Sequence, residues 1–320
     1  MIDTSQATTQ KEKVKIITDK LEKGIKELMS SEKYMEYLSK MSKLHNYSFR
    51  NTVLILMQHP DATMVASLTT WNKEFHRSVN KGEKGITILA PCKYKKYVDK
   101  FVYDDSGDIR KDNDGVPITK RELVESLTFK PTYVFDAGQT HGEPIPQIAV
   151  SELTGNVENY DKIVEAIKSV SPVDISFENY NSSAKGFYSN AEKRIVIKEG
   201  MEELQTLKTL IHEVAHSILH DNEIMKSTGE QKDTQTKEVE AESIAYTVSS
   251  YLGLDTSDYS FGYVSGWAGE RKIDAVKESM ETIRKTADEL ITAIERQLHP
   301  ELTVDRTESQ QHTQSRAMAV

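Results

Sequence analysis

The chain has 320 residues, of which 28% are charged, with a formal net charge of −9 and a mean hydropathy of −0.55. This length allows two domains of ordinary size, and no apolar run approaches the ~20 residues of a membrane-spanning helix. The Lys-rich N-terminus lacks the apolar segment of a secretory signal, and the single cysteine, Cys92, excludes an internal disulfide framework. We therefore expect a cytoplasmic protein without a membrane partner.

The charge is divided unevenly along the chain. Residues 1–146 carry a net charge of +3 and the remaining residues a net charge of −12. The basic excess is concentrated in residues 40–100. Such an asymmetry indicates that the two halves have different partners.

In the first half, apolar residues recur at helical spacing over residues 11–43 and 49–58, so we expect helices there, the last one ending before Pro60. A short helix is expected to start at Trp71. Residues 86–90 predict a strand that Pro91 ends, and residues 94–103 are a candidate second strand paired with it. Residues 104–122 are rich in Asp, Lys and Gly, which favours a mobile hairpin tip, and residues 132–135 predict another strand.

The second half begins with a predicted helix over residues 157–170 and a strand over 173–177. A hairpin of residues 186–189 and 194–197 follows, directly before the next predicted helix. Helices are predicted over 204–219, over 237–252 up to Gly253, and over 271–297. The polar residues 299–320 are expected to be disordered.

The most informative motif is His212-Glu213-Val214-Ala215-His216, which lies within the helix predicted over 204–219. Two histidines four residues apart share one helix face, so both can bind one metal ion. Glu213, next to the first ligand, can take a proton from the attacking water. A helix with two surface or capping histidines is the alternative interpretation.

A catalytic zinc takes three protein ligands, and the next helix offers Glu238 as the third. Glu242, one turn later on the same face, is expected to accept a hydrogen bond from the outer nitrogen of a ligand histidine. Glu240 points to another face and is expected to meet solvent. We reject His220 as a ligand, because it lies about 12 Å along the helix from His212. Instead, it is expected only to end the helix.

In these motifs, the chain resembles the ArdC-type antirestriction proteins, including LtrC-like proteins of mobile elements. The matching stretches are Tyr47-Ser48-Phe49-Arg50-Asn51, Thr70-Trp71, Lys81-Gly82-Glu83-Lys84-Gly85-Ile86, Val134-Phe135-Asp136 and Gln139-Thr140. The second half is similar to the zinc-peptidase half of the same proteins and, more distantly, to ImmA/IrrE-type metallopeptidases. There, the match consists of His212, Glu213, His216, Glu238, Ala241, Glu242 and Ala245.

The resemblance implies an α+β protein of two domains that protects incoming plasmid DNA from restriction during conjugation. Residues 1–146 would form an α+β single-stranded DNA-binding domain and residues 147–298 a zincin-like, gluzincin-type metallopeptidase domain with Zn²⁺. The gluzincin pattern supports Glu238 as a ligand with Glu242 behind it, although the second acid is more commonly Asp. Gln139 and Thr140 are family positions whose chemistry does not follow from the residues.

Single strands are bound by cations along the phosphates and by aromatic rings on which bases stack. The candidate DNA-binding residues are Tyr47, Phe49, Arg50, Trp71, Arg77, Lys81, Lys84, Lys93 and Lys95, with Phe75, Tyr94, Lys96 and Tyr97 as further possibilities. Phe49 and Trp71 could equally be core residues, and lysines on a hairpin usually form a solvated face.

Two functions remain open. In the first, a zinc peptidase is brought to single-stranded DNA, Glu213 acts as the general base, and Tyr188 or Tyr263 stabilises the oxyanion on an unidentified protein substrate. In the second, the protein shields DNA from nucleases by binding alone, and the zinc site is structural or vestigial.

Overall fold

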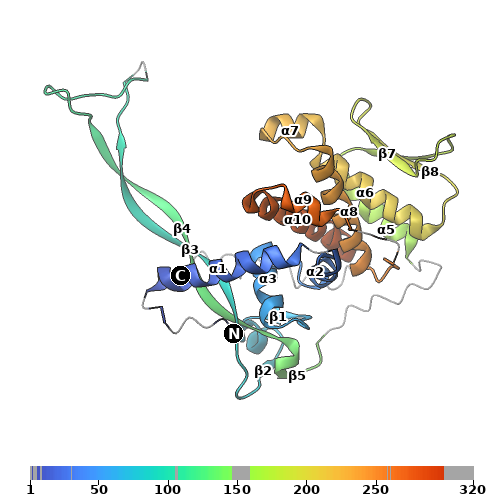
Figure 1. Ribbon diagram of the computed structural model, residues 1–320, viewed down its shortest axis with the longest axis horizontal. Helices are drawn as coiled ribbons and strands as arrows, with labels where there is room; N and C mark the ends of the chain where they lie inside the picture. The colour runs from blue at the N-terminus through green and yellow to red at the C-terminus, as the bar shows by residue number, and fades with distance from the viewer. Residues whose placement is uncertain are drawn as a thin grey trace.

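The structure is a computed structural model that describes residues 2, 6, 7, 9–29, 31–104, 107–145, 159–257, 259 and 261–298. Figure 1 shows a body of packed helices and short strands from which a long two-stranded ribbon projects. This mixture of helices and separate sheets confirms the expected α+β class. Within the described residues, no helix combines the length and the apolar composition needed to cross a bilayer.

Three helices open the chain, as the apolar spacing predicts: α1 (Gln10–Leu28), α2 (Ser31–Lys43) and α3 (Phe49–Gln58). At the start of α1, the Thr9 hydroxyl accepts a hydrogen bond from the Glu12 amide, and the Glu12 carboxylate accepts one from the Thr9 amide. This reciprocal pair satisfies two amides that the helix itself leaves without partners. The hydroxyl of Ser48 caps α3 through the amide of Asn51.

Short elements lead from α3 to the ribbon and back: β1 (Val65–Ala66), α4 (Leu68–Lys73), β2 (Arg77–Val79), η1 (Ala137–Gln139) and β5 (Thr140–Gly142). Strand β2 pairs antiparallel with β5. Helix α4 starts before the predicted Trp71, because the Ser67 hydroxyl caps it by accepting a hydrogen bond from the Thr70 amide at 3.1 Å.

The ribbon, named the arm, consists of β3 (Ile86–Phe101) and β4 (Thr119–Asp136), which pair antiparallel from Ile86↔Val134 to Phe101↔Thr119. The prediction that Pro91 ends a strand is wrong, because β3 continues through Pro91. Residues 94–103 do not pair with residues 86–90 either: both stretches pair with β4. An edge strand such as β3 tolerates proline, because only one of its sides needs amide donors.

The second half contains α5 (Tyr160–Val170), β6 (Asp174–Glu178), β7 (Gly186–Ser189), β8 (Arg194–Lys198), α6 (Glu203–Leu219), α7 (Asn222–Thr228), α8 (Thr234–Tyr251), α9 (Val264–Gly269) and α10 (Ile273–Leu298). The sheet order is β6-β8-β7, with β6 parallel and β7 antiparallel to β8. These elements confirm the predicted helices and the predicted hairpin, with ends that shift by a few residues. They leave β7 at an edge of the sheet.

One apolar core spans both halves of the chain. Helix α2 packs against α8, and α10 packs against α5 and α8. Between α2 and α8, the Tyr34 hydroxyl lies 2.8 Å from the Ser243 hydroxyl, and both groups are buried. The N-terminal helices are therefore part of the support of the second half. The predicted boundary at residue 146 and the predicted disordered tail, 299–320, lie outside the described residues.

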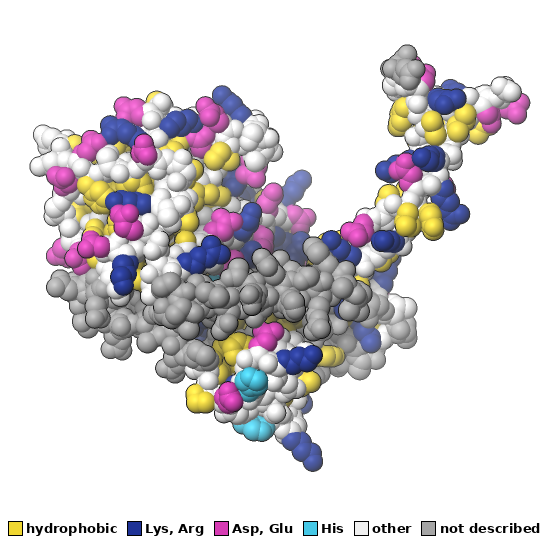
Figure 2. Space-filling model, turned by 180° about the vertical axis from the view of Figure 1, so that it is seen from behind, with side chains coloured by type: hydrophobic (Ala, Val, Ile, Leu, Met, Phe, Trp, Pro, Cys, Tyr) yellow, Lys and Arg dark blue, Asp and Glu magenta, His cyan; other side chains and the backbone are white. Residues whose placement is uncertain are grey.

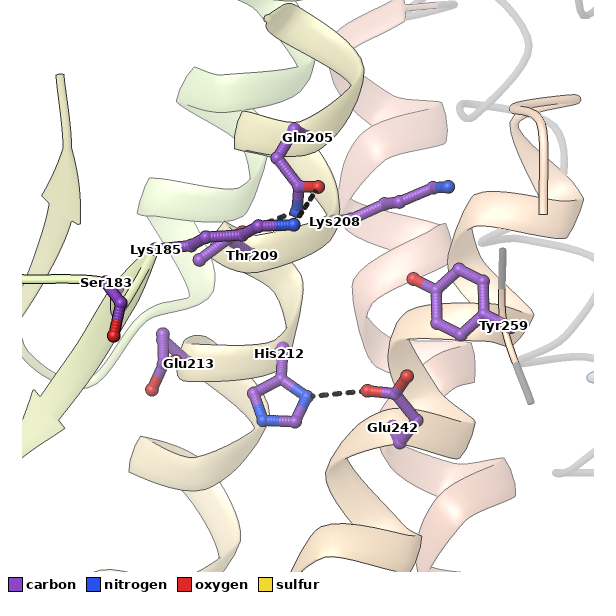
Figure 3. Close-up of a pocket in the computed structure, with 10 residues that line it drawn as sticks. Ser183, Lys185, Gln205, Lys208, Thr209, His212, Glu213, Glu242 and Tyr259 are labelled. Atoms are coloured by element: carbon purple, nitrogen blue, oxygen red, sulfur yellow. Dashed lines mark hydrogen bonds and ion pairs between the residues drawn. The ribbon is translucent and has the colours of Figure 1, made fainter. Parts of the chain in front are cut away.

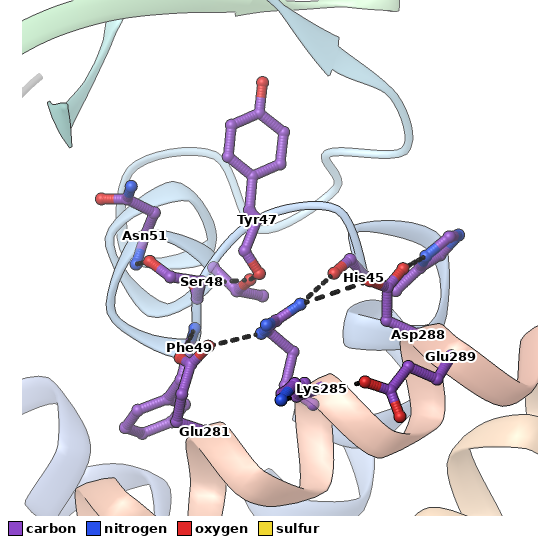
Figure 4. A network of polar contacts seen from close by, with 11 residues as sticks. His45, Tyr47, Ser48, Phe49, Asn51, Glu281, Lys285, Asp288 and Glu289 are labelled. Carbon is purple, nitrogen blue, oxygen red and sulfur yellow. Dashed lines mark hydrogen bonds and ion pairs between the residues drawn. The ribbon is translucent and has the colours of Figure 1, made fainter. Parts of the chain in front are cut away.

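A polar network joins the start of α3 to α10 (Figure 4). The Phe49 amide donates a hydrogen bond to the Glu281 carboxylate at 2.7 Å, and His45 Nδ1 lies 2.6 Å from Asp288 Oδ1. The Arg284 guanidinium donates to the His45 carbonyl and to Glu281, each at 2.8 Å. The Glu281 carboxylate lies at the first turn of α3, where the helix dipole stabilises a negative charge. Because Glu281 belongs to α10, this contact ties the first half of the chain to the second.

Candidate metal centre and arm surface

Helix α6 presents His212 and His216 one turn apart on the same face, and their Nε2 atoms lie 3.1 Å apart. Three residues on the apolar side of α6, Leu207, Leu210 and Val214, are completely buried. Because this packing prevents the helix from rotating, both imidazoles project from a fixed backbone. The four-residue spacing of His212 and His216 therefore brings two nitrogen donors close together.

Glu238 of α8 contributes a carboxylate to the same point. Its Oε1 lies 3.5 Å from His216 Nε2, and its Oε2 lies 3.7 Å from His212 Nε2. The three side chains each offer a ligand atom, and these atoms lie within 4.8 Å of one another. Donors bound at about 2.0–2.1 Å to a tetrahedral zinc are roughly 3.3–3.5 Å apart. The triangle therefore has the donor types and the dimensions that a metal ion requires.

Glu242, one turn after Glu238, contacts the outer nitrogen of His212 (Figure 3), with Oε2 3.2 Å from Nδ1. A carboxylate in this position keeps the proton on Nδ1 and leaves the Nε2 lone pair for a metal. Burial by itself would lower the pKa of His212. The hydrogen bond to Glu242 and the nearby carboxylates outweigh burial and raise that pKa.

Glu213 lies beside His212 at a cleft of about 390 Å³ (Figure 3). The cleft is also lined by Ser183, Lys185, Gly186, Gln205, Lys208, Thr209, Glu242 and Tyr259. Burial raises the pKa of Glu213, against a smaller opposing effect of the His212 charge and of the Tyr188 backbone amide, which donates a hydrogen bond to the carboxylate. A raised pKa suits a carboxylate that must accept a proton and release it again.

The structure corrects the expectations for Glu240 and His220. Glu240 does not meet solvent: its side chain is 0% exposed, and its Oε2 lies 2.9 Å from His220 Nε2. His220 does end α6, but its Nδ1 also lies 2.9 Å from His216 Nδ1. Burial, with the neighbouring His212 and His220 rings, lowers the pKa of His216 to about 3, so its ring is in the neutral form that binds metal. The repeated four-residue histidine spacing was the sequence signal for this contact.

The two tyrosines considered as oxyanion donors occupy different environments. The Tyr188 hydroxyl donates a hydrogen bond to Asp221, so it is already engaged. Tyr263, directly before α9, is 39% exposed. Burial and the charges of Glu242 and Glu238 raise the pKa of Tyr263 to about 12, so its hydroxyl keeps its proton near neutral pH. Because the Tyr188 hydroxyl is engaged by Asp221, Tyr263 is the better candidate of the two.

Two of the predicted DNA-binding residues are core residues. Phe49 is 1% exposed and Trp71 is 0% exposed. The Phe49 ring packs edge-on against Tyr37, and Trp71 Nε1 donates a hydrogen bond to the Phe135 carbonyl at 2.8 Å. A base can stack only on an exposed ring. The assignment of these two residues as stacking surfaces is therefore corrected.

Tyr47 and Arg77 are partly buried and are bonded within the protein. The Tyr47 hydroxyl donates to the Val65 carbonyl at 2.8 Å, and burial raises the pKa of Tyr47 to about 12. Arg77 donates from Nε to the Thr140 hydroxyl at 2.8 Å and from Nη2 to the Thr140 carbonyl at 2.9 Å, which ties β2 to β5. These contacts also give Thr140 a structural role.

Exposed apolar and cationic side chains share one face of the arm. Directly opposed residues of an antiparallel pair lie on the same face, and faces alternate along each strand. The face that contains Tyr97, named the arm face, also presents the exposed residues Lys93, Lys95, Phe101, Arg121, Leu123, Leu127, Phe129 and Tyr133, together with Asp99 and Glu125. The Arg121 guanidinium lies 4.9 Å from the centre of the Tyr97 ring.

Figure 2 shows hydrophobic and basic side chains gathered along the projecting arm. Tyr94 and Lys96 lie on its opposite face. The pairing that assembles this surface became visible only with the structure. The other predicted cations, Arg50, Lys81 and Lys84, are exposed outside the arm face.

Comparisons with known proteins agree with a division into two functional parts. Residues 169–259 match the family model described as the IrrE N-terminal-like domain, which is a peptidase family of zincin-like fold. Residues 7–135 match the model described as the N-terminal domain of anti-restriction factor ArdC. The chain is thus an ArdC-like protein of two domains, an ArdC-type N-terminal domain followed by an IrrE-like domain.

The individual proteins that resemble this chain share less than a third of its residues. An uncharacterized protein of Bacillus anthracis is 29% identical over 323 residues, which cover 90% of this chain and 52% of that protein. The chain therefore spans about half the length of this curated relative. Two crystal structures of the antirestriction ArdC protein from the R388 plasmid, one metal-free and one Mn(II)-bound, are each 18% identical. They cover 78% and 79% of this chain and 85% of the R388 chain, with TM-scores of 0.46 and 0.43.

Proposed function

We propose that this chain is an antirestriction-type protein of a mobile element that binds single-stranded DNA and carries a zinc-dependent metallopeptidase site. In this proposal, residues 1–146 bind DNA and residues 147–298 form the peptidase. The observation that carries the peptidase half is the triangle of His212, His216 and Glu238 with Glu213 beside it at the cleft. Three protein ligands leave a fourth position for water, as in catalytic zinc sites.

The residues of the site have distinct tasks in peptide hydrolysis. Zinc, when bound, supplies a Lewis acid that polarises the scissile carbonyl. Glu213 takes the proton of the attacking water and then delivers it to the leaving amine. The outer edge of β7, where the Tyr188 amide contacts Glu213, can hold the substrate backbone by strand addition. The Tyr263 hydroxyl is the candidate donor to the oxygen on which negative charge develops.

Two imidazoles and one carboxylate are donors that suit zinc. Elemental analysis of the purified protein tests this assignment, with His212→Ala as the variant that removes one ligand. We expect one zinc ion per chain in the wild type and a loss of zinc in the variant. Another divalent metal in the wild type would change the assigned ion, and the same metal content in both proteins would contradict the ligand set.

The arm face supports the DNA-binding half of the proposal. It exposes four aromatic rings, Tyr97, Phe101, Phe129 and Tyr133, and the cations Lys93, Lys95 and Arg121. Cations that follow phosphates and rings that stack with bases are the two elements of single-strand binding. We expect a labelled oligothymidine to bind more tightly than a duplex of the same length, as measured by fluorescence anisotropy. Equal affinities would contradict a preference for single strands.

The alternative function, DNA shielding by binding alone with a structural or vestigial zinc site, is separated by one substitution. Glu213→Gln removes the general base and leaves all three ligands in place. We expect this variant to retain zinc and DNA binding but to lose protection of an unmodified plasmid during transfer into a restricting host. Peptide hydrolysis by the variant should fall by about 10²–10⁴-fold.

The matched control is Glu223→Gln on α7, which changes an 80% exposed carboxylate outside the cleft. Protection by this variant should equal that of the wild type. Full protection by Glu213→Gln would instead favour the binding-only function.

A further inference from the structure

We propose that His220 and Glu240 are positioning residues that fix the tautomer of His216 and thereby direct its Nε2 lone pair at the metal. This inference rests on the proposed metal site and concerns residues that neither bind the ion nor contact substrate. Glu242 performs the corresponding task for His212 through a direct contact of 3.2 Å. For His216, the carboxylate is one imidazole further away.

The chain of contacts is continuous and buried. His216 Nδ1 lies 2.9 Å from His220 Nδ1, and His220 Nε2 lies 2.9 Å from Glu240 Oε2. The side chains of His220 and Glu240 are 3% and 0% exposed. Lys232 Nζ lies 3.0 Å from the same Glu240 oxygen, so the buried carboxylate has a cationic partner. Water therefore has little access to replace any of these contacts.

With Glu240 ionised and His220 neutral, the direction of every hydrogen bond in this chain is determined. A carboxylate can only accept, so His220 must carry its proton on Nε2. The Nδ1 atom of a neutral His220 then has a lone pair and must accept from His216 Nδ1–H. His216 is left with a free lone pair on Nε2, which is the atom 3.5 Å from Glu238 and 3.1 Å from His212.

The opposite arrangement is unfavourable. If His216 carried its proton on Nε2, its Nδ1 would accept from His220, and the Nε2 lone pair of His220 would face the Glu240 carboxylate. Two acceptors at 2.9 Å in a buried site repel each other and leave a buried polar group unsatisfied. The paired carboxylate therefore favours the metal-binding tautomer of His216 before any metal arrives.

The geometry of α8 explains why an intermediate ring is needed. Glu238 and Glu242 share one face of α8, whereas Glu240, two residues from each, points roughly 200° away from Glu238. Its carboxylate cannot reach His216 directly. His220, one turn beyond His216 at the end of α6, spans this gap.

Two substitutions at residue 220 test the proposal. His220→Gln can still accept from His216 with its carbonyl oxygen and donate to Glu240 with its amide, whereas His220→Phe fills a similar volume and can do neither. We expect His220→Phe to bind Zn²⁺ about 10–100-fold more weakly than the wild type in chelator competition. His220→Gln should bind within a few-fold of the wild type. Equal affinity of the wild type and a folded His220→Phe, with unchanged thermal melting, overturns the proposal.

A second measurement needs no metal, and its decisive result comes from the wild type. Nitrogen-15 spectra of the metal-free protein report which nitrogen of His216 carries the proton, and we expect Nδ1 in the wild type. A wild-type His216 protonated on Nε2 overturns the proposal even if the variants fail to fold. A shift toward Nε2–H in Glu240→Gln supports it. Because neither readout involves proteolysis, an inactive peptidase leaves the inference standing, whereas a wild type that binds no Zn²⁺ overturns both proposals.

Discussion

The metal centre and the arm support their functional side chains in opposite ways. At the candidate metal centre, each of the two histidines contacts a further polar group: His212 contacts Glu242, and His216 contacts the buried His220. On the arm, Tyr97 and Phe101 are exposed on a two-stranded ribbon. A catalytic group must be held close to its productive geometry, whereas a stacking surface tolerates variation in what it binds. The contrast fits the proposed chemistry at the first region and the proposed adaptable binding at the second.

The root of the arm belongs to neither region. The side-chain amide of Asn51 donates to the Leu89 carbonyl at 3.1 Å and accepts from the Leu89 amide at 2.9 Å. Gln58 makes the same pair of bonds with Thr87, at 2.9 and 3.1 Å. These contacts attach β3 to α3 and satisfy backbone groups on the side of β3 that does not pair with β4. The family motif around residues 47–51 thus builds the base on which the arm stands.

The largest expected effect tests the separation of core from binding surface. Trp71→Ala removes a completely buried indole and its hydrogen bond to Phe135. We expect the free energy of unfolding to fall by about 3–5 kcal/mol in chemical denaturation. Single-strand affinity, measured where the variant is folded, should stay near that of the wild type because the ring reaches no surface. A folded variant that loses most of its DNA affinity would break the distinction.

Tyr97→Ala should have the reverse profile. Its ring is 62% exposed, so we expect a change in unfolding free energy within about 0.5 kcal/mol. Loss of one stacked base should weaken single-strand binding by about 1–3 kcal/mol in anisotropy titrations. Tyr94→Ala is the matched control, because Tyr94 is 44% exposed on the opposite face of the same strand. Equal losses in the two variants would refute a one-sided binding surface.

The clustering of the candidate metal-binding residues could be predicted from the sequence because helical periodicity converts residue spacing into direction. His212, His216, Glu238 and Glu242 all follow from that rule and lie together in the structure. The surroundings of Glu240 could not be predicted, because its direction is set by α8 but its burial depends on which elements pack there. His220 bonds it in place of solvent.

The arm was less accessible to sequence reasoning for a different reason. Residue type does not distinguish a buried Trp71 from an exposed Tyr97, since aromatic rings occur in both environments. Which residues share a face across the two strands depends on the pairing register, which the 17 residues between Phe101 and Thr119 do not reveal. The stretches 86–90, 94–101 and 132–135 were recognisable as extended, whereas residues 119–131 of β4 were not predicted as strand.

A smaller effect concerns the polar cluster beside the metal centre. Hydrogen bonds from Lys193 and Tyr188 hold the pKa of Asp221 well below its usual range. A carboxyl group with a lowered folded pKa stabilises the fold above its unfolded pKa of about 3.9, and this stabilisation is lost as the pH falls through the folded value. Asp221→Asn keeps the α7 cap, because asparagine caps equally well.

We therefore expect Asp221→Asn to cost on the order of 1 kcal/mol near neutral pH, after allowance for solvent screening of the ion pair. The difference from the wild type should shrink below about pH 4. Denaturation at a series of pH values measures both. A difference that persists unchanged in acid would indicate lost packing at β7 in place of lost charge.

The smallest expected effect, on the salt dependence of DNA binding, tests which face of the arm contacts the phosphates. The face opposite the arm face carries Lys96, Lys100, Lys120 and Lys130 against Glu122, so it is the more basic of the two. Attraction by charge alone would place DNA there, whereas stacking places it on the side of Tyr97. Neighbouring lysines, Lys95 on the arm face and Lys96 on the other, separate the two cases.

For single strands, each phosphate contact contributes about 0.7 to the slope of log affinity against log salt. We expect Lys95→Ala to reduce the magnitude of this slope by about that amount and Lys96→Ala to change it less, because only contacting cations release counterions. Both variants remove the same charge, so a shared change in overall field cancels in the comparison. If Lys96→Ala reduces the slope more than Lys95→Ala does, the phosphates contact the face opposite the arm face. The exposed rings of the arm face would then bind a different partner.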